Sequence, residues 1–151
     1  MIPIPIEDFE HHLKNIPLSA WEPLFKIVPK LKKTQCLGKY VYPKHFKDSM
    51  FAYKVYKEKP IVEDTIKQIL RLNLMPVFDW MSWEEGYAML KNPDFDYSTL
   101  NALTLCKLLT YIFREDRFNF GFLYDCFENR SMVNILDQLT VQIKRNISQD
   151  N

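Results

Sequence analysis

Glycine, cysteine and histidine are scarce in this chain, at three residues each among 151. Scarce glycine argues against an all-β protein, because the tight turns between short strands often need glycine at positive φ. No apolar run approaches the roughly 20 residues that cross a bilayer, so we expect no contact with a membrane. The first residues contain neither a basic region nor a long apolar region, and we therefore expect no signal peptide.

The sequence also lacks the short patterns of several enzyme classes. It contains no glycine-rich phosphate loop, no His-Glu-x-x-His, no Gly-x-Ser-x-Gly and no paired cysteine ligands for zinc. Its cysteines, Cys36, Cys106 and Cys126, are odd in number and form no close pair, which is typical of the reducing cytoplasm. We therefore predict a cytoplasmic protein and assign no catalytic residue, no metal site and no cofactor.

Apolar residues, in contrast, are plentiful. They make up 47% of the chain, and aromatic residues make up 15%, which excludes a disordered protein. A chain of this length can bury one substantial core, and its apolar residues recur mostly at three- and four-residue steps. We predict a single, mainly α-helical domain over residues 1–151, with about six or seven helices and a short β-hairpin near residues 40–56.

The most strongly patterned stretch is residues 96–145. Its first helix is expected to start at Asp96 or Ser98, both good N-caps, and its leucines cover most faces, so we place it in the centre of the core. A second helix is predicted over residues 119–128, with Asn129 as its left-handed stop. A third helix follows at once, and such short turns force the three helices to pack on each other.

Towards the N-terminus, proline and capping residues predict the ends of two further helices. Ser19-Ala-Trp-Glu22 matches the capping box, so a helix should start at Ser19. Pro29 should then end or bend that helix. Pro60 suits the first position of another helix, and Asn73 suits its stop.

Four charged residues, Arg114 to Arg117, lie where the first two helices of the patterned stretch meet. One interpretation is a solvated helix end, as most charge runs are. The other is that one arginine turns inward to pair with a carboxylate, since its guanidinium satisfies several acceptors at once. Asp79, beside Trp80 and Trp83, is the predicted partner. The two tryptophans themselves indicate either a core anchor or a ring-lined pocket with one acid.

The chain is similar to a bacterial and archaeal family known only as a domain of unknown function. The similarity covers about residues 58–139 and rests on one combined pattern: Phe78-Asp-Trp80, Trp83, Leu108-Leu-Thr110, Arg114, Arg117-Phe118, Gly121 and the Ile135-Leu136 helix. Arg130 departs from the family pattern, which favours glycine at this position. Because the usual glycine stop is absent here, Asn129 is left to end the helix. We divide the domain into a variable basic part, residues 1–59, and a family-like core, residues 60–147.

The resemblance implies no activity, cofactor or partner. It does imply that seven residues belong to one group, namely Asp79, Trp80, Trp83, Arg114, Arg117, Phe118 and Gly121. All of these except Gly121 are our candidate binding residues.

Positive charge is concentrated in one part of the chain. Residues 26–59 contain ten lysines and two acidic residues, a net charge of +8, whereas the remainder has a net charge of −7. Interleaved aromatic and basic residues are typical of single-stranded nucleic-acid platforms. The candidates for such a platform are Lys39, Tyr40, Tyr42, Lys44, Lys47, Tyr53, Lys54, Tyr56 and Lys57. The alternative is a loop whose aromatic rings fold back as core.

We therefore expect first a non-enzymatic binding or regulatory module that acts through contacts with another protein. The second hypothesis is nucleic-acid binding, either through residues 26–59 or through the C-terminal helices, which are only mildly basic. The third is a small enzyme with a pocket formed by Asp79, Arg114 and Arg117.

Overall fold

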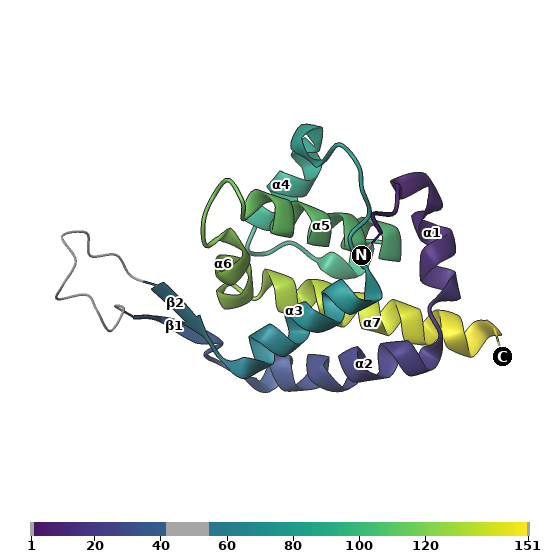
Figure 1. Ribbon diagram of the computed structural model, residues 1–151, viewed down its shortest axis with the longest axis horizontal. Helices are drawn as coiled ribbons and strands as arrows, with labels where there is room; N and C mark the ends of the chain where they lie inside the picture. Colours follow the sequence, from purple (N-terminus) through teal and green to yellow (C-terminus); the bar gives the residue numbers. More distant parts are fainter. Residues whose placement is uncertain (1, 42–54, 151) are drawn as a thin grey trace.

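The computed structural model describes residues 2–41 and 55–150. Within these ranges it confirms a mainly α-helical single domain with one antiparallel hairpin (Figure 1). The α-helices are α1 (Ile6–Asn15), α2 (Leu18–Lys33), α3 (Pro60–Leu72), α4 (Glu84–Lys91), α5 (Ala102–Glu115), α6 (Phe122–Glu128) and α7 (Ser131–Asp150). The remaining elements are strands β1 (Gly38–Val41) and β2 (Val55–Glu58) and the 3-10 helices η2 (Trp80–Ser82) and η3 (Tyr97–Thr99). Over the described ranges, no helix combines the length and the apolar character that a bilayer crossing needs.

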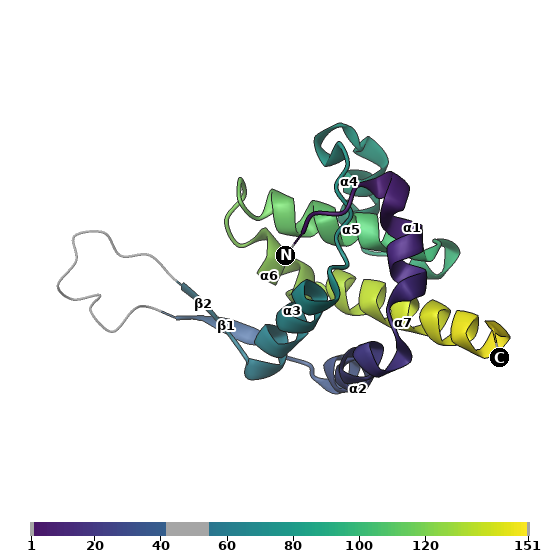
Figure 2. The same ribbon diagram turned by 45° about the vertical axis from the view of Figure 1, so that its right-hand side comes forward.

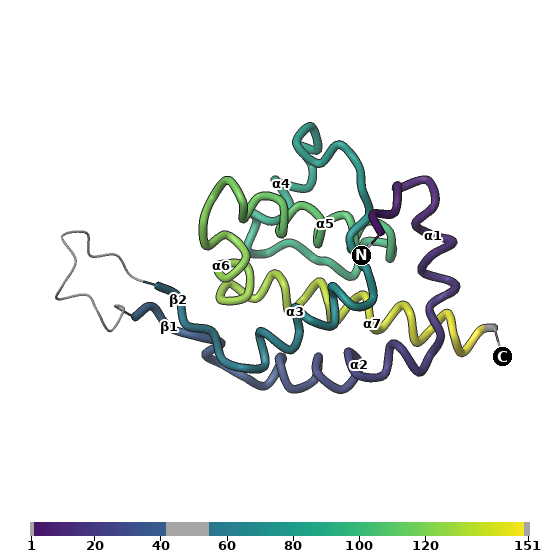
Figure 3. Tube along the Cα trace, viewed as in Figure 1, coloured from purple at the N-terminus to yellow at the C-terminus, as the bar shows by residue number. Residues whose placement is uncertain are grey.

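Helix α5 lies in the middle of the domain, as its apolar pattern predicts. It packs against α7, α6, α4 and η2, while α2 packs against α3 and α7. Its buried residues face in nearly all directions and are Leu105, Cys106, Leu108, Leu109, Thr110, Tyr111 and Ile112. In the Cα trace of Figure 3, α2 leads towards the hairpin and α3 leads back beside it. The core therefore lies between the α2–α3 pair and α5, with α7 running through it.

The predicted start of α5 is wrong, because Asp96 caps a different element. The Asp96 carboxylate accepts the N–H of Ser98 at 3.0 Å and so begins the single turn η3. Leu100 is then extended, and Asn101 becomes the N-cap of α5 by accepting the N–H of Thr104 at 2.8 Å. Two caps five residues apart thus divide what the sequence suggests is one helix.

The turn between α6 and α7 also differs from the prediction. Asn129 has φ −82°, and the left-handed residue is Arg130, at φ 73°. Asn129 caps the next helix instead, because its side-chain oxygen accepts the N–H of Ser131 at 3.0 Å. The left-handed position is therefore the one where the resembled family favours glycine.

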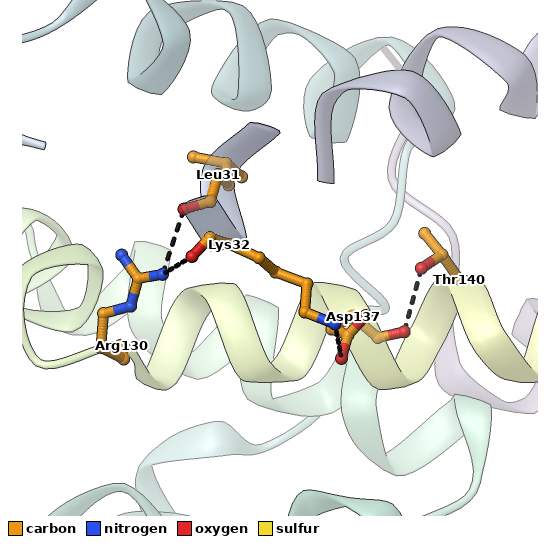
Figure 4. Close-up of polar contacts among 5 residues, drawn as sticks. All are labelled: Leu31, Lys32, Arg130, Asp137 and Thr140. Carbon is orange, nitrogen blue, oxygen red and sulfur yellow. Dashed lines mark hydrogen bonds and ion pairs between the residues drawn. The ribbon is translucent and has the colours of Figure 1, made fainter. Parts of the chain in front are cut away.

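The side chain of Arg130 joins this turn to the end of α2. Its guanidinium donates to the carbonyl oxygens of Lys32 at 2.9 Å and Leu31 at 3.1 Å (Figure 4). It also donates to the carbonyl oxygen of Thr34 at 2.8 Å. Beside it, Lys32 forms an ion pair with Asp137 at 3.2 Å. The arginine thus supplies additional donors to carbonyls at the C-terminal end of α2, where helical hydrogen bonds run out.

At α2 the predicted capping box and the predicted end at Pro29 are wrong, whereas at α3 the predictions hold. Helix α2 begins at Leu18 behind an extended Pro17, so Ser19 makes no capping bond, and the helix continues past Pro29 to Lys33. Buried apolar residues on both sides of that proline hold the helix against the core. Helix α3 begins at Pro60 and stops at Asn73, whose φ is 53°, as the sequence indicates.

The hairpin extends from one end of the helical domain (Figures 1 and 2) and is fastened to α6 by two tyrosines. Tyr40 lies opposite Tyr56, and their hydroxyls donate to Asp125 (3.2 Å) and to Glu128. Gly38 makes room for the Tyr56 ring, since a Cβ there would lie 2.5 Å from it. These contacts fix the base of the hairpin.

Candidate functional site

The end of α5 presents two neighbouring faces to two different sites. Thr110, Phe113, Arg114 and Arg117 are spaced i, i+3, i+4 and i+7, which places them on one side of the helix end, and they line one cleft. Tyr111 lies about 100° round the helix from Thr110, and its ring contacts Trp80 on the neighbouring face. The two sites are therefore adjacent but separate.

The first site, which we call the aromatic surface, is a continuous set of rings. Trp80 contacts Phe118 at 6.0 Å and Tyr111 at 5.4 Å between ring centroids. Tyr111 in turn contacts Tyr87 at 6.5 Å and Phe122 at 6.4 Å. Burial, with the charge of Glu115 as a second cause, raises the pKa of the Tyr111 hydroxyl, so this ring stays neutral at physiological pH.

Several side chains of the aromatic surface are open to solvent. Phe118 is 74% exposed, Met81 beside Trp80 is 71% exposed, and Phe120 is 92% exposed. Tyr87 is also exposed, whereas Trp80 is half-buried and packs against the core. We define the aromatic surface as the contacting rings, together with two exposed residues that follow Trp80 and Phe118 closely in the sequence. The rings are Trp80, Tyr87, Tyr111, Phe118 and Phe122, and the two exposed residues are Met81 and Phe120.

Trp83 belongs to a different cluster. Its ring meets Phe78 edge-on at 5.6 Å, and the Lys107 ammonium lies 4.2 Å from the centre of the Trp83 ring. Gly86 allows this placement, because a Cβ there would come within 2.3 Å of the indole. The structure therefore separates Trp83 from Trp80, which the sequence places in one group.

The predicted ion pair of Asp79 is not formed. Asp79 is exposed at the start of η2, and the ion pair found within the described ranges joins Lys32 to Asp137. The reason is geometric: η2 packs on α5, where Trp80 meets Tyr111, whereas Arg114 and Arg117 line the cleft. Trp80 and Phe118 are brought together, and so are the two arginines, but these pairs contribute to different sites.

The second site, which we call the arginine cleft, has a volume of about 340 Å³. It lies between the N-terminal segment, the end of α3, the residues that follow α3 and the end of α5. Its lining residues are Pro3, Leu70, Asn73, Met75, Val77, Thr110, Phe113, Arg114, Asp116 and Arg117.

The structure describes only part of the predicted nucleic-acid platform. Tyr42, Lys44, Lys47, Tyr53 and Lys54 lie outside the described residues. Of the others, Tyr56 is buried against Tyr124, and its pKa is raised by burial and by the hydrogen bond to Glu128. Lys39 and Lys57 lie directly opposite each other on the two strands, one residue away from the tyrosine pair. The platform remains a prediction.

Sequence reasoning missed Met81, Tyr87, Tyr111, Phe120 and Phe122. A signal was available for two of them. Tyr111 precedes Phe118 by seven residues, two helical turns, and Phe120 follows in a short stretch that is otherwise charged or polar. Tyr87 and Phe122 join the surface through tertiary contacts, which spacing along the chain does not reveal.

Comparison with known proteins identifies a family but no activity. The model of a family described as a family of unknown function (DUF6508) matches residues 16–145. The match begins well before residue 58 and therefore includes the basic segment that the resemblance left out. No curated protein and no solved structure matches the chain.

Proposed function

The chain belongs to this family of unknown function, DUF6508, and from its own surfaces we propose a non-enzymatic binding module that acts through contact with another protein. The aromatic surface is the contact site in this proposal. The observation that carries it is the exposure of Phe118, whose ring contacts the half-buried Trp80, together with the exposure of Met81 and Phe120, which lie close to these two residues in the sequence.

Exposed rings in such a group have a physical cost. Isolated apolar side chains on a surface are ordinary, whereas adjoining ones mark interaction sites, because a partner removes them from water together. Trp, Tyr and Met are also enriched at protein interfaces, where few large side chains supply most of the binding energy. Trp80 fits the role of anchor, since Tyr111 and the core hold its ring in place while its other ring contact, Phe118, is exposed.

The partner that suits this surface is a protein segment with an apolar or aromatic side chain. Such a side chain would pack beside Trp80 and be enclosed by Phe118 and Met81. A short segment is enough, because the rings are linked over only a few residues of η2, α4 and the end of α5.

A peptide-display selection tests the proposal. Segments selected on the protein should carry aromatic or large aliphatic residues, and Phe118→Ser should weaken their binding about tenfold or more, as loss of an interface hot spot does. The variant should remain folded, since most of this side chain is in solvent.

Leu18→Ser is the matched control, because Leu18 is an exposed apolar residue at the start of α2. Its binding should equal that of the unmodified protein. A selection that yields no specific segment, or segments bound equally well by the Phe118→Ser variant, would contradict the proposal.

We also propose a cytoplasmic location, supported by Cys36, Cys106 and Cys126, which are all free thiols.

A second candidate function, nucleic-acid binding, is favoured by the cross-strand pair Lys39–Lys57 on the projecting hairpin. A mobility-shift titration with single-stranded nucleic acid at increasing salt tests it, because binding through lysines should weaken steeply as salt rises. Absence of binding at low salt would eliminate this candidate.

A further inference from the structure

We propose that the arginine cleft binds a small molecule that carries an oxyanion, a carboxylate or a phosphate, on an apolar body. This site is separate from the aromatic surface and goes beyond the protein contacts proposed above. The inference rests on which polar groups of the cleft already have partners, on its apolar walls and on its net charge.

Three of the polar residues in the cleft are already hydrogen-bonded. The Thr110 hydroxyl donates to the carbonyl of Pro76 at 2.7 Å, and the Asn73 side-chain amide donates to the carbonyl of Ile2 at 2.8 Å. Asp116 accepts the N–H of Leu123 at 3.0 Å. The donors left for a ligand are thus mainly the two guanidinium groups.

Within the described ranges, the side chains of Arg114 and Arg117 make no hydrogen bond and no ion pair. Elsewhere, the guanidinium of Arg71 donates to the carbonyl of Ala20, and that of Arg130 donates to carbonyls at the end of α2. Arg114 is moreover half-buried. The guanidinium groups of Arg114 and Arg117, with five N–H donors each, therefore line a cleft in which no protein group of the described ranges accepts their hydrogen bonds.

The charge in the cleft favours an anion. Arg114 and Arg117 outnumber Asp116, whose carboxylate is turned to the first turn of α6. Glu115 is not among the lining residues, and its charge acts on Tyr111 on the neighbouring face. Guanidinium groups bind carboxylate and phosphate oxygens in pairs, which adds direction to the attraction.

The walls of the cleft suit the rest of the ligand. Four apolar side chains line the cleft: Leu70 and Val77 are exposed, and Met75 and Phe113 are half-buried. An apolar body would cover these side chains and exclude water from the arginines, which strengthens the electrostatic attraction. The volume, about 340 Å³, falls in the range of small-molecule sites, roughly 300–1,000 Å³, rather than that of a folded partner.

The test uses three probes that share a phenyl ring: 3-phenylpropanoate, phenyl phosphate and the neutral 3-phenylpropanol. Binding is measured by NMR titration of the ¹⁵N-labelled protein. We expect at least one anion to bind about tenfold more tightly than the alcohol and to shift signals of the cleft. A preference for phenyl phosphate would identify a phosphate ester as the natural group, and a preference for phenylpropanoate a carboxylate.

Arg117→Gln and Arg114→Gln should each weaken binding of the anion about tenfold, and Arg145→Gln, an exposed arginine on α7, should leave it unchanged. Arg117 is exposed, so its variant keeps the fold even if Arg114→Gln does not. Phe118→Ser should retain anion binding, which separates this site from the aromatic surface. Equal binding of the alcohol, equal binding by Arg117→Gln, or no binding of either anion at tens of millimolar would overturn the proposal.

Discussion

Arg130 combines an unfavourable backbone with favourable side-chain contacts. A left-handed conformation costs a non-glycine residue roughly 1–2 kcal/mol. The three hydrogen bonds from its guanidinium to the end of α2 offset that cost. Glycine at this position would relieve the strain but would leave those carbonyls without the donor, whereas alanine would remove the donor and keep the strain.

Alanine and glycine at position 130 should therefore lower the free energy of unfolding by different amounts. Arg130→Ala should lower the free energy of unfolding by about 2–3 kcal/mol, because it loses charged hydrogen bonds and keeps the strain. Arg130→Gly should lower it by about 1 kcal/mol less, since glycine adopts positive φ freely. Urea denaturation measures both. A larger loss for glycine than for alanine would show that the backbone at this residue is not strained.

The three cysteines should differ sharply in reactivity. Cys36 is exposed, whereas Cys106 and Cys126 are buried, and burial raises the pKa of both of these thiols, that of Cys126 to about 12. Only a thiolate reacts quickly, so a thiol reagent at pH 8 should modify one cysteine of the folded protein and three after denaturation. Rapid modification of two or three thiols in the folded state would contradict the packing of α5 and α6.

At the scale of the element, α5 should carry much of the stability. Leu109 is fully buried in the middle of this helix, and Leu109→Ala should cost about 2–5 kcal/mol through lost contacts and a cavity. Leu103 is half-buried on the same helix, so Leu103→Ala is the control and should lower the free energy of unfolding by less. Chemical denaturation compares the two. A loss at Leu109 no greater than that at Leu103 would mean that α5 is not central.

The attachment of the hairpin to α6 should depend on pH. Burial and the bond to Glu128 raise the pKa of Tyr56 above its ordinary value of about 10, so the folded protein holds this proton more tightly than the unfolded chain. The resulting stabilisation is complete below pH 10 and is lost as the pH rises above it. Unfolding free energies between pH 8 and 11 should fall more steeply for the unmodified protein than for Tyr56→Phe. Parallel curves for the two proteins would refute this role of Tyr56.

Much of the arrangement of elements could be predicted from the sequence, but the exact ends often could not. Pro60 and Asn73 bound α3 because each residue type has a strong local preference that no contact opposes. Asp96 gives a wrong start for α5, because aspartate caps a single 3-10 turn as well as it caps a long helix. Arg130 could not be predicted, since its left-handed backbone is stabilised by α2, about 100 residues away.

The sequence indicated some residues of the two candidate sites but not how these residues are grouped. Arg114, Arg117, Trp80 and Phe118 all lie at surfaces or clefts, yet the two arginines line the cleft with Thr110, whereas Tyr111, the next residue, contacts the ring of Trp80. The three- and four-residue steps from Thr110 to Arg117 were readable as one face. The segments that cover this face could not be predicted, because the N-terminal segment and the residues after α3 come from distant parts of the chain.

At the scale of the whole molecule, the proposed contacts are distributed over distinct surfaces. The aromatic surface and the arginine cleft flank the end of α5, and the hairpin extends from one end of the domain (Figure 1). Positive charge is concentrated between residues 26 and 59, whereas the rest of the chain is acidic overall. An apolar contact at the aromatic surface should be little affected by salt, because screening acts on charges.

The central claim, that the aromatic surface binds a protein segment, is tested most directly by the indole N–H signals of the three tryptophans. A segment chosen by display is titrated into the ¹⁵N-labelled protein, with buried Trp21 as an internal control. The account predicts that the Trp80 signal shifts with saturation while the Trp21 signal stays fixed, and that Phe118→Ser removes the shift. A bound segment that leaves the Trp80 signal unchanged would contradict it.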